Sequence, residues 1–339
     1  MLVQSFCTVD DLVRDNEGGG IPNSMLSRFI LPASQYVAQE IGPFLPVQET
    51  KKFTGSGTTG LFVPPLLRLT GTIDNYGSQM TDAVLAGADG SVRPMWADGP
   101  YGFILSCLSD AWVWSTYPHG IQVPGVWGMY ERSRATGASL ASLQGVSAET
   151  LSVADGSKLS PGMVLLIESE WQYISDYGTP TASVTTLSDN LDASSEILSL
   201  TSGVAVKVGE IIRVGFEQMR VLDVQSNTAY VERGWGKTKR VSHLISAAVD
   251  AYRTFVVSRA VNGSTAVEHA QATALSQMVV PEDINYLARQ IATLMFKKSQ
   301  TGYAGRAGSP ETGETFYNHE FPRDVIARIK SNYYFPHTR

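Results

Sequence analysis

The sequence predicts an α+β chain: a helical domain built from both ends, with an all-β region inserted between the two halves. Three observations predict this class. Apolar residues recur at helical spacing near each end, in 24–41 and in 284–295. The composition changes at Ala135 and again near Pro281, with short apolar alternations and few helix signals in between. Terminal halves of one domain often lie close together, which is why an insertion between them is tolerated.

The first residues predict two helices. Thr8 and Asp11 have capping-box spacing, with aspartate in place of the usual glutamate, so a short helix is expected to start there. Ser24 is expected to cap a longer helix. Pro32 lies inside that helix and is expected to kink or split it.

Residues 47–73 are predicted to be β structure. Two runs, 47–53 and 61–63, flank several glycines and predict a hairpin with a loose loop. Residues 121–127 alternate around a Pro-Gly pair like a bent strand. The helical domain, 1–135 with 281–339, is therefore expected to carry a small β element.

The inserted region, 136–280, contains an internal repeat. At an offset of 47 positions, the recurring pairs are Leu151 and Leu198, Gly162 and Gly209, Ile167 and Val214, Glu170 and Glu217, and Ile174 and Val221. At an offset of 26, the pairs are Val231 and Val257, Arg233 and Arg259, Thr238 and Ser264, and His243 and His269. One interpretation is a module of residues 150–180 that resumes at 252–275, with a sibling module, 196–250, inserted into it. A simple tandem is the alternative, and strand pairing would distinguish the two.

The residues after Pro281 are predicted to be helical again. Glu282 and Asp283 suit the first turn of a helix. A last helix is expected to open at Pro322 and to bury one apolar face.

The charge balance bears on possible partners. The formal net charge is −6, which argues against tight binding of phosphate groups because that requires clustered Lys and Arg. Two cysteines make no disulfide framework, and no apolar run approaches the length of a membrane span. We therefore expect no membrane partner, and no specific binding of any DNA that passes the protein.

No catalytic, cofactor-binding or metal site is expected. The five histidines show no close metal-ligand spacing. His243 and His269 occupy equivalent repeat positions, which favours a structural role. Gly236-Lys237-Thr238 spells the end of a phosphate loop, but Val231 stands where the earlier glycine is required. Glu170 and Glu217 could form a pair of catalytic carboxylates, although their equivalent positions favour a structural residue used twice.

The two ends of the chain resemble the head–tail connector (adaptor) family of long-tailed bacteriophages. The residues that carry this resemblance are Ser34 and Val37, the run 53–64, the stretch 121–128 and the segment 281–304. In that family a helical bundle is built from both chain ends, with a small β element between them. The resemblance therefore refines the predicted fold to α+β, a helical bundle built from both chain ends with a small β element, plus an inserted all-β region of two related modules.

The insertion resembles small β modules found in phage virion proteins. One copy is marked by Gly209, Glu217, Val231, Arg233, Gly234 and His243, and the other by Arg259, Asn262, Gly263, Ser264, Thr265 and His269. Adaptors are usually shorter than this chain, so the resemblance supplies no task for the insertion.

The resemblance implies a structural virion protein and not an enzyme. Such adaptors form a homo-oligomeric ring, usually twelvefold, in the neck of the virion beneath the portal. The ring forms part of the DNA channel used in genome ejection. It links the portal protein to a tail, stopper or tail-terminator protein, and it assembles in the host cytoplasm.

Residues near the end of the sequence are the predicted portal contact. They are Tyr333, Tyr334, Phe335, Pro336, His337 and Arg339. Aromatic residues and arginine are enriched at the energetic centres of interfaces, and adaptors of the resembled family often grip the portal by their C-terminal segment. The alternative is that these rings fold back onto the chain's own helices.

Two other functions stay open. The chain could be another phage neck, tail-completion or baseplate structural protein, in which the β modules are decoration domains. It could also be a tail-associated hydrolase that uses an unrecognised carboxylate pair.

Overall fold

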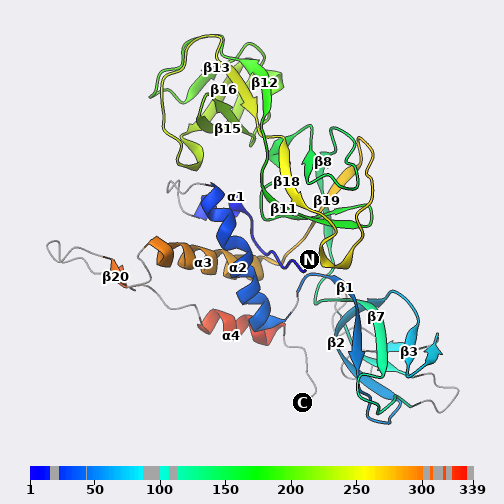
Figure 1. Cartoon of the computed structure of the whole chain (residues 1–339). Helices are drawn as coiled ribbons and strands as arrows, with labels where there is room; N and C mark the ends of the chain where they lie inside the picture. The colour runs from blue at the N-terminus through cyan, green and yellow to red at the C-terminus, as the bar shows by residue number, and fades with distance from the viewer. Residues whose placement is uncertain are drawn as a thin grey trace.

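The computed structural model describes residues 1–15, 23–42, 44–81, 83–86, 100–106, 113–300, 306–307, 316–317 and 323–333. In these residues the regular structure is mostly β, with one seven-stranded sheet and two six-stranded sheets (Figure 1). The predicted helical bundle with a small β element is therefore wrong as a fold class. The error arose in 73–105, where strands of three to five residues are too short to show a clear alternation.

The N-terminal sheet is the part that the sequence underestimated. Its strands are β1 (Val47–Phe53), β2 (Gly60–Leu69), β3 (Ile73–Asn75), β4 (Ser78–Met80), β5 (Val84–Ala86), β6 (Tyr101–Leu105) and β7 (Ile121–Trp127). They follow the order β4-β3-β7-β2-β6-β5, and β1 pairs with β7. The sheet has its own core, which includes Trp114, Trp127 and Ile104.

The expected hairpin of 47–53 with 61–63 does not form. β1 instead pairs along its whole length with β7, from Val47 opposite Trp127 to Phe53 opposite Ile121. Both β1 and β2 therefore use β7 as a neighbour. The local pattern specified that two strands exist, but packing against a strand about 70 residues further along decided their partner.

Two further sheets occupy the inserted region. Module A is the sheet of β8 (Ser133–Ser139), β9 (Thr150–Ser152), β10 (Val164–Ile167), β11 (Glu170–Tyr177), β18 (Thr254–Ser258) and β19 (Ala274–Met278). Module B is the sheet of β12 (Thr181–Thr186), β13 (Ile197–Ser199), β14 (Ile211–Val214), β15 (Glu217–Gln225), β16 (Thr228–Arg233) and β17 (Ala248–Ala251). Four short 3₁₀ turns belong to these modules: η1 (Gly156–Lys158), η2 (Gly203–Ala205), η3 (Trp235–Lys237) and η4 (Val261–Gly263).

The strands of the two modules pair in a nested order. β11 of module A pairs with β18, across the whole of module B, and β10 pairs with β19. No strand of module A pairs with a strand of module B in the described residues. Module B thus projects beyond module A, joined to it by the two crossings at 178–180 and 252–253 (Figure 1).

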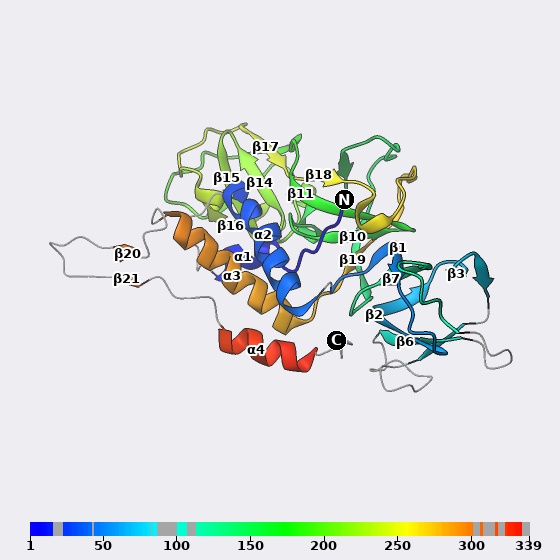
Figure 2. The same ribbon diagram turned by 60° about the horizontal axis from the view of Figure 1, so that its bottom comes forward.

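Helices from both ends of the chain meet. They are α1 (Val9–Asp15), α2 (Asn23–Ile41), α3 (Glu282–Gln300) and α4 (Arg323–Asn332); α2 packs on α3, and both contact α1 and α4 (Figure 2). A short two-stranded sheet, β20 (Arg306–Ala307) and β21 (Phe316–Tyr317), lies between α3 and α4 in sequence. Phe29 of α2 meets Phe296 of α3 edge to face, with ring centroids 5.9 Å apart.

The sequence signals at the first two helices had different outcomes. The capping box is confirmed: the Thr8 N–H donates to Asp11 Oδ2 at 2.9 Å, and the Asp11 N–H donates to Thr8 Oγ1 at 3.2 Å. Pro32 does not split α2, which continues from Asn23 to Ile41.

The helices share their core with module A. Buried residues of α1, α2 and α3 form one cluster with module A residues Val164, Trp171, Tyr173 and Val261. Module B has a separate cluster of its own, in which Leu198, Ile212 and Val231 take part. Module A is therefore built into the body of the protein, whereas module B is a separate lobe.

Candidate functional site

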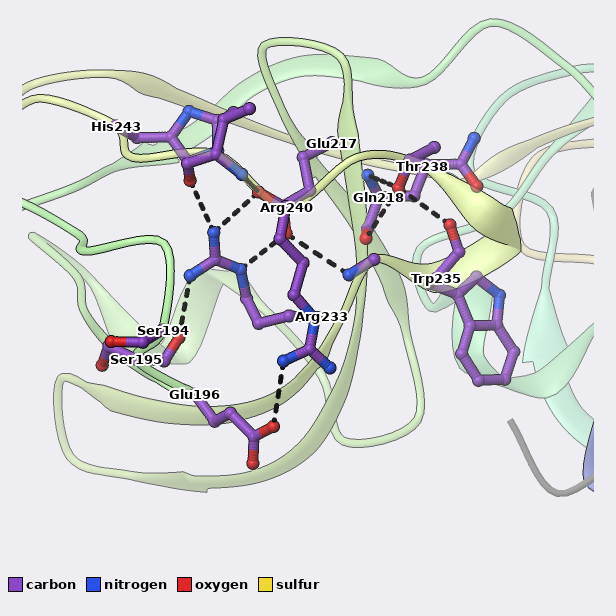
Figure 3. A network of polar contacts seen from close by, with 12 residues as sticks. Ser194, Ser195, Glu196, Glu217, Gln218, Arg233, Trp235, Thr238, Arg240 and His243 are labelled. Carbon is purple, nitrogen blue, oxygen red and sulfur yellow. Dashed lines mark hydrogen bonds and ion pairs between the residues drawn. The ribbon is translucent and has the colours of Figure 1, made fainter. Parts of the chain in front are cut away.

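Module B contains a buried charged network at one end of its sheet (Figure 3). Glu217 begins β15 and Arg233 ends β16, and neither side chain is exposed. The guanidinium donates from Nε to Glu217 Oε1 at 2.6 Å and from Nη2 to Glu217 Oε2 at 2.7 Å. His243 Nε2 lies 3.0 Å from the same Oε2. The network therefore fixes two strands and a loop relative to one another.

Arg233 and Glu217 also form hydrogen bonds with backbone groups. Arg233 donates to the carbonyl oxygens of Asp192, Ser195 and Val241, at 2.9, 2.8 and 2.7 Å. Glu217 accepts the N–H groups of Gly234 and Val241, at 3.3 and 3.2 Å. A buried ion pair costs desolvation unless such additional bonds complete it, and here they are present.

Module A repeats this network. Arg259 donates to both oxygens of Glu170 at 2.6 Å, and His269 Nε2 lies 2.9 Å from Glu170 Oε2. The counterpart backbone bonds run from Arg259 to the carbonyls of Gly145 and Val267, and from the N–H groups of Ala260 and Val267 to Glu170. The offsets of 47 and 26 seen in the sequence thus correspond to matching hydrogen bonds.

The electrostatics keep both carboxylates ionised. Burial raises the pKa of Glu170, but the hydrogen bonds from Arg259, His269 and two backbone N–H groups outweigh burial and lower it to about 2. The pKa of Glu217 is lowered in the same way, against the effect of burial, by Arg233, His243 and the Val241 N–H.

This geometry does not suit either carboxylate to act as a general acid or base. A general acid or base needs a pKa near the working pH and access to substrate, and these groups have neither. Glu170 and Glu217 also belong to different sheets, each with its own arginine and histidine. They do not form a pair across one cleft, so the two-carboxylate hydrolase has no support from these residues.

The Gly236-Lys237-Thr238 run is likewise structural. It forms the turn η3, with Gly236 and Lys237 at positive φ, and no α-helix follows it. Thr238 Oγ1 accepts the Gln218 N–H at 2.9 Å and donates to the Trp235 carbonyl oxygen at 2.9 Å (Figure 3). Ser264 bonds the backbone of Trp171 and Val261 at the equivalent place in module A.

A third buried carboxylate lies at the junction of the two modules. Glu210, which is not exposed, accepts from Arg253 Nε at 2.6 Å and from the Gly156 N–H of module A at 3.3 Å. The hydrogen bond to Glu210 raises the pKa of the Arg253 guanidinium. Because Arg253 lies in the second crossing, this pair braces the connection between the modules.

Sequence reasoning missed the Glu210–Arg253 pair. At the offset of 47, the counterpart of Glu210 is Met163, so the repeat gave no reason to select it. The one available signal was a charged residue that breaks the repeat directly after the turn glycine Gly209.

Of the predicted portal-contact residues, only Tyr333 lies in the described part of the chain. Its ring meets Phe44 edge to face at 5.2 Å, and its hydroxyl donates to Asp283 Oδ1 at 3.0 Å. Burial, together with the bond to Asp283, raises the pKa of Tyr333. Tyr333 therefore packs on the chain's own helices, whereas Tyr334, Phe335, Pro336, His337 and Arg339 lie outside the described residues.

A polar cavity of about 600 Å³ lies between α1, α3 and module A. Its walls carry charges of both signs, including Asp10, Glu282, Arg134 and Lys158. Burial raises the pKa of Asp10, and the charge of Arg220 from module B opposes this rise. Because the walls carry charges of both signs, they do not favour a ligand of either charge.

Within the described residues, no group of three or more His, Cys, Asp and Glu side chains could hold a metal ion. None of the described helices is long and apolar enough to cross a membrane. No family model, curated protein or solved structure matches the chain.

Proposed function

We propose that this chain is a structural protein of a tailed-phage virion, the head-to-tail adaptor. In this proposal it forms a homo-oligomeric ring beneath the portal, surrounds part of the DNA channel and joins the capsid to the tail. Its partners are the portal protein above and a tail or stopper protein below.

The observation that carries this proposal is the meeting of helices from both ends of the chain. α2 packs on α3, and α4 contacts both of them. The chain as a whole is mostly β and is not the helical bundle expected from the resemblance, so the support for the adaptor is limited to this contact between helices of the two ends. The contact includes both apolar and charged pairs: Phe29 meets Phe296, and Lys330 of α4 pairs with Glu40 of α2.

The charged networks also support a structural role. Glu170 and Glu217 brace loops at the ends of the two modules, and Glu210 braces their junction. The formal net charge of −6 suits a channel wall through which DNA moves without being held.

A second candidate is another neck, tail-completion or baseplate protein. The observation that favours it is the amount of β structure: three sheets of six or seven strands, of which module B is a separate lobe with its own core. Such a lobe would suit a decoration domain on the outside of a tail.

Symmetry distinguishes the two candidates. We expect electron microscopy and native mass spectrometry of the full chain to show a ring of twelve subunits. A stable threefold or sixfold assembly would favour a tail component over the adaptor. Cleavage of cell-wall or glycan substrates by the same sample would reject both structural proposals.

Portal binding tests the adaptor directly. The best variant for this test removes the residues after Tyr333. Tyr333 itself is kept, because it packs on Phe44 and its removal would disturb the fold. We expect this variant to stay folded and to lose capture of the portal protein of the same virus. A variant that lacks module B is the control, and it should still bind. Normal capture by the truncated chain would move the portal contact elsewhere.

A further inference from the structure

The first eight residues form an extended segment that is buried although it belongs to no helix or strand. Five of them in a row, Val3 to Cys7, are 5% exposed or less. The segment leads from the N-terminus, near the place where module A meets β1, to α1 (Figure 1). A buried segment without a strand ladder of its own needs other elements to bond its backbone groups. We call residues 1–8 the strap.

Module A holds the strap through one side chain of the turn η4. The Val3 N–H donates to Asn262 Oδ1 at 2.6 Å, and Asn262 Nδ2 donates to the Val3 carbonyl oxygen at 2.9 Å. The Asn262 N–H also donates to the Met1 carbonyl oxygen at 2.8 Å. The side-chain amide therefore takes the place that a neighbouring strand would have. The same turn lies against β1, because a Cβ built on Gly263 would be 1.9 Å from the Gln48 carbonyl oxygen.

The strap also bonds the N-terminal sheet and the helices. Gln4 Oε1 accepts the N–H groups of Phe44 and Leu45, at 3.0 and 2.7 Å, directly before β1. The Phe6 N–H donates to Ser34 Oγ of α2 at 3.0 Å. Three parts of the protein thus meet on one extended segment.

The repeat shows that Asn262 is not needed to form its turn. Its counterpart in module B, at the offset of 26, is Gly236 of η3. Both residues have the left-handed backbone conformation, with φ of +54° and +60°. The turn therefore forms with either residue, and the bonds that the Asn262 side chain makes are bonds to the strap.

The partners of the strap lie far from it in the sequence. Ser34, Leu45 and Asn262 are 28, 41 and 259 residues from the strap residues that they bond. These bonds require α2, the residues before β1 and module A to be in place already. The N-terminal sheet and module A also have core clusters that contain no strap residue. Segments that lack a ladder open locally at a lower free energy than such cores.

We propose that the strap is a separable clamp, which seats after the rest of the chain has folded and locks the N-terminal sheet to module A and α2. When the strap opens, its bonds to Asn262, Leu45 and Ser34 are lost together while the cores of the sheet and of module A persist. This inference concerns a single chain and does not depend on the proposed ring.

Cys7 gives a direct probe of strap opening. The chain has two cysteines, so Cys107→Ser leaves Cys7 as its one thiol. Cys7 is 2% exposed, and a thiol reagent reaches it only when the strap leaves its place. Labelling is measured in the full chain, without denaturant and in low concentrations of urea. Local opening exposes little surface, so the labelling rate should rise far less steeply with urea than global unfolding does.

The repeat supplies the variant and its control. Asn262→Gly gives η4 the residue of η3, which keeps the turn and removes the grip on Val3. Labelling of Cys7 should become at least about tenfold faster. Gly236→Asn places the same amide in module B, where it has no strap to hold, and should leave the rate unchanged. Gln4→Ala removes the bonds to the residues before β1 and should also speed labelling.

Hydrogen exchange of the same variants tests the locking of the sheet. The amides of Phe44 and Leu45 should exchange faster in Asn262→Gly, in step with the labelling of Cys7. Amides between β2 and β6 should keep their rates, because the core of the sheet stays closed. Three results would overturn the proposal. They are labelling of Cys7 that follows global unfolding in urea, labelling that Asn262→Gly and Gln4→Ala leave unchanged, and faster labelling without faster exchange at Phe44 and Leu45.

Discussion

At the scale of single residues, the chain uses one arrangement twice. Each module buries a glutamate whose two oxygens receive an arginine, a histidine and backbone N–H groups. The arginine in turn ties down carbonyl oxygens of two loops. Removing one member of such a set leaves the others buried and unpaired, which costs more than the intact set contributes.

Glu217→Gln should therefore destabilise module B by about 3–5 kcal/mol, because Arg233 remains buried without a counter-charge. Hydrogen exchange of residues 181–251 measures this locally. Glu196→Gln is the control: Glu196 is 61% exposed and its pair with Arg240 should be worth less than about 1 kcal/mol. Equal effects of the two substitutions would contradict the structural role of Glu217.

The network of Glu170 also predicts a response to acid. The folded chain lowers the pKa of this carboxyl from 4.5 to about 2, so the unfolded chain takes up a proton at higher pH than the folded one. Its contribution to stability is complete above pH 4.5 and is lost as the pH falls toward 2. Denaturation curves from pH 6 to pH 2 should show this loss. Glu170→Gln, which cannot titrate, should start less stable and lose less over the same range.

At the scale of elements, local sequence patterns predicted which segments form helices and strands better than they predicted which segments pack together. The capping box of α1 and the bent strand β7 both formed where the sequence indicated. The hairpin of β1 with β2 did not form, because β7 pairs with both strands. Tyr333 illustrates the same limit at the end of α4, where an aromatic residue selected as a surface contact packs against Phe44.

Substitutions of Tyr333 test that packing. Tyr333→Phe keeps the ring but removes the donor to Asp283, and it should cost about 1 kcal/mol. Tyr333→Ala also removes the contact with Phe44 and should cost about 2 kcal/mol or more. Thermal melting of the full chain measures both. Lys330→Ala is the control, because it removes only an exposed ion pair and should change stability by less than about 1 kcal/mol. Equal melting points for Tyr333→Ala and Lys330→Ala would place the ring of Tyr333 outside the core.

At the scale of the molecule, the two β modules have different relations to the body. Module A contributes Val164, Trp171, Tyr173 and Val261 to the core of the helices. Module B keeps its apolar residues in its own cluster. The two crossings lie side by side, since Tyr177 pairs with Phe255 and the Gly178 N–H donates to the Thr254 carbonyl oxygen at 2.8 Å.

Module B should therefore be removable. Replacing 179–253 by Asn-Gly would close β11 and β18 into a hairpin and would remove Glu210 together with Arg253. We expect the shortened chain to be soluble and to melt cooperatively. Replacing the whole of 136–280 by a Gly/Ser linker should instead unfold the helices, because module A leaves their core. A folded product from the larger deletion, or an unfolded one from the smaller, would contradict this division.

The sequence by itself determined the features that short-range patterns encode. The helical periodicity of α2 and α3, the cap of α1 and the repeated positions of glutamate, arginine and histidine could all be read from spacing alone. Only the tertiary structure decided that β1 pairs with β7, that Glu210 meets Arg253, and that module A shares a core with the helices whereas module B does not. The physical reason is that periodicity specifies which face of a segment is buried. The choice of what covers that face depends on packing summed over residues far apart in the chain.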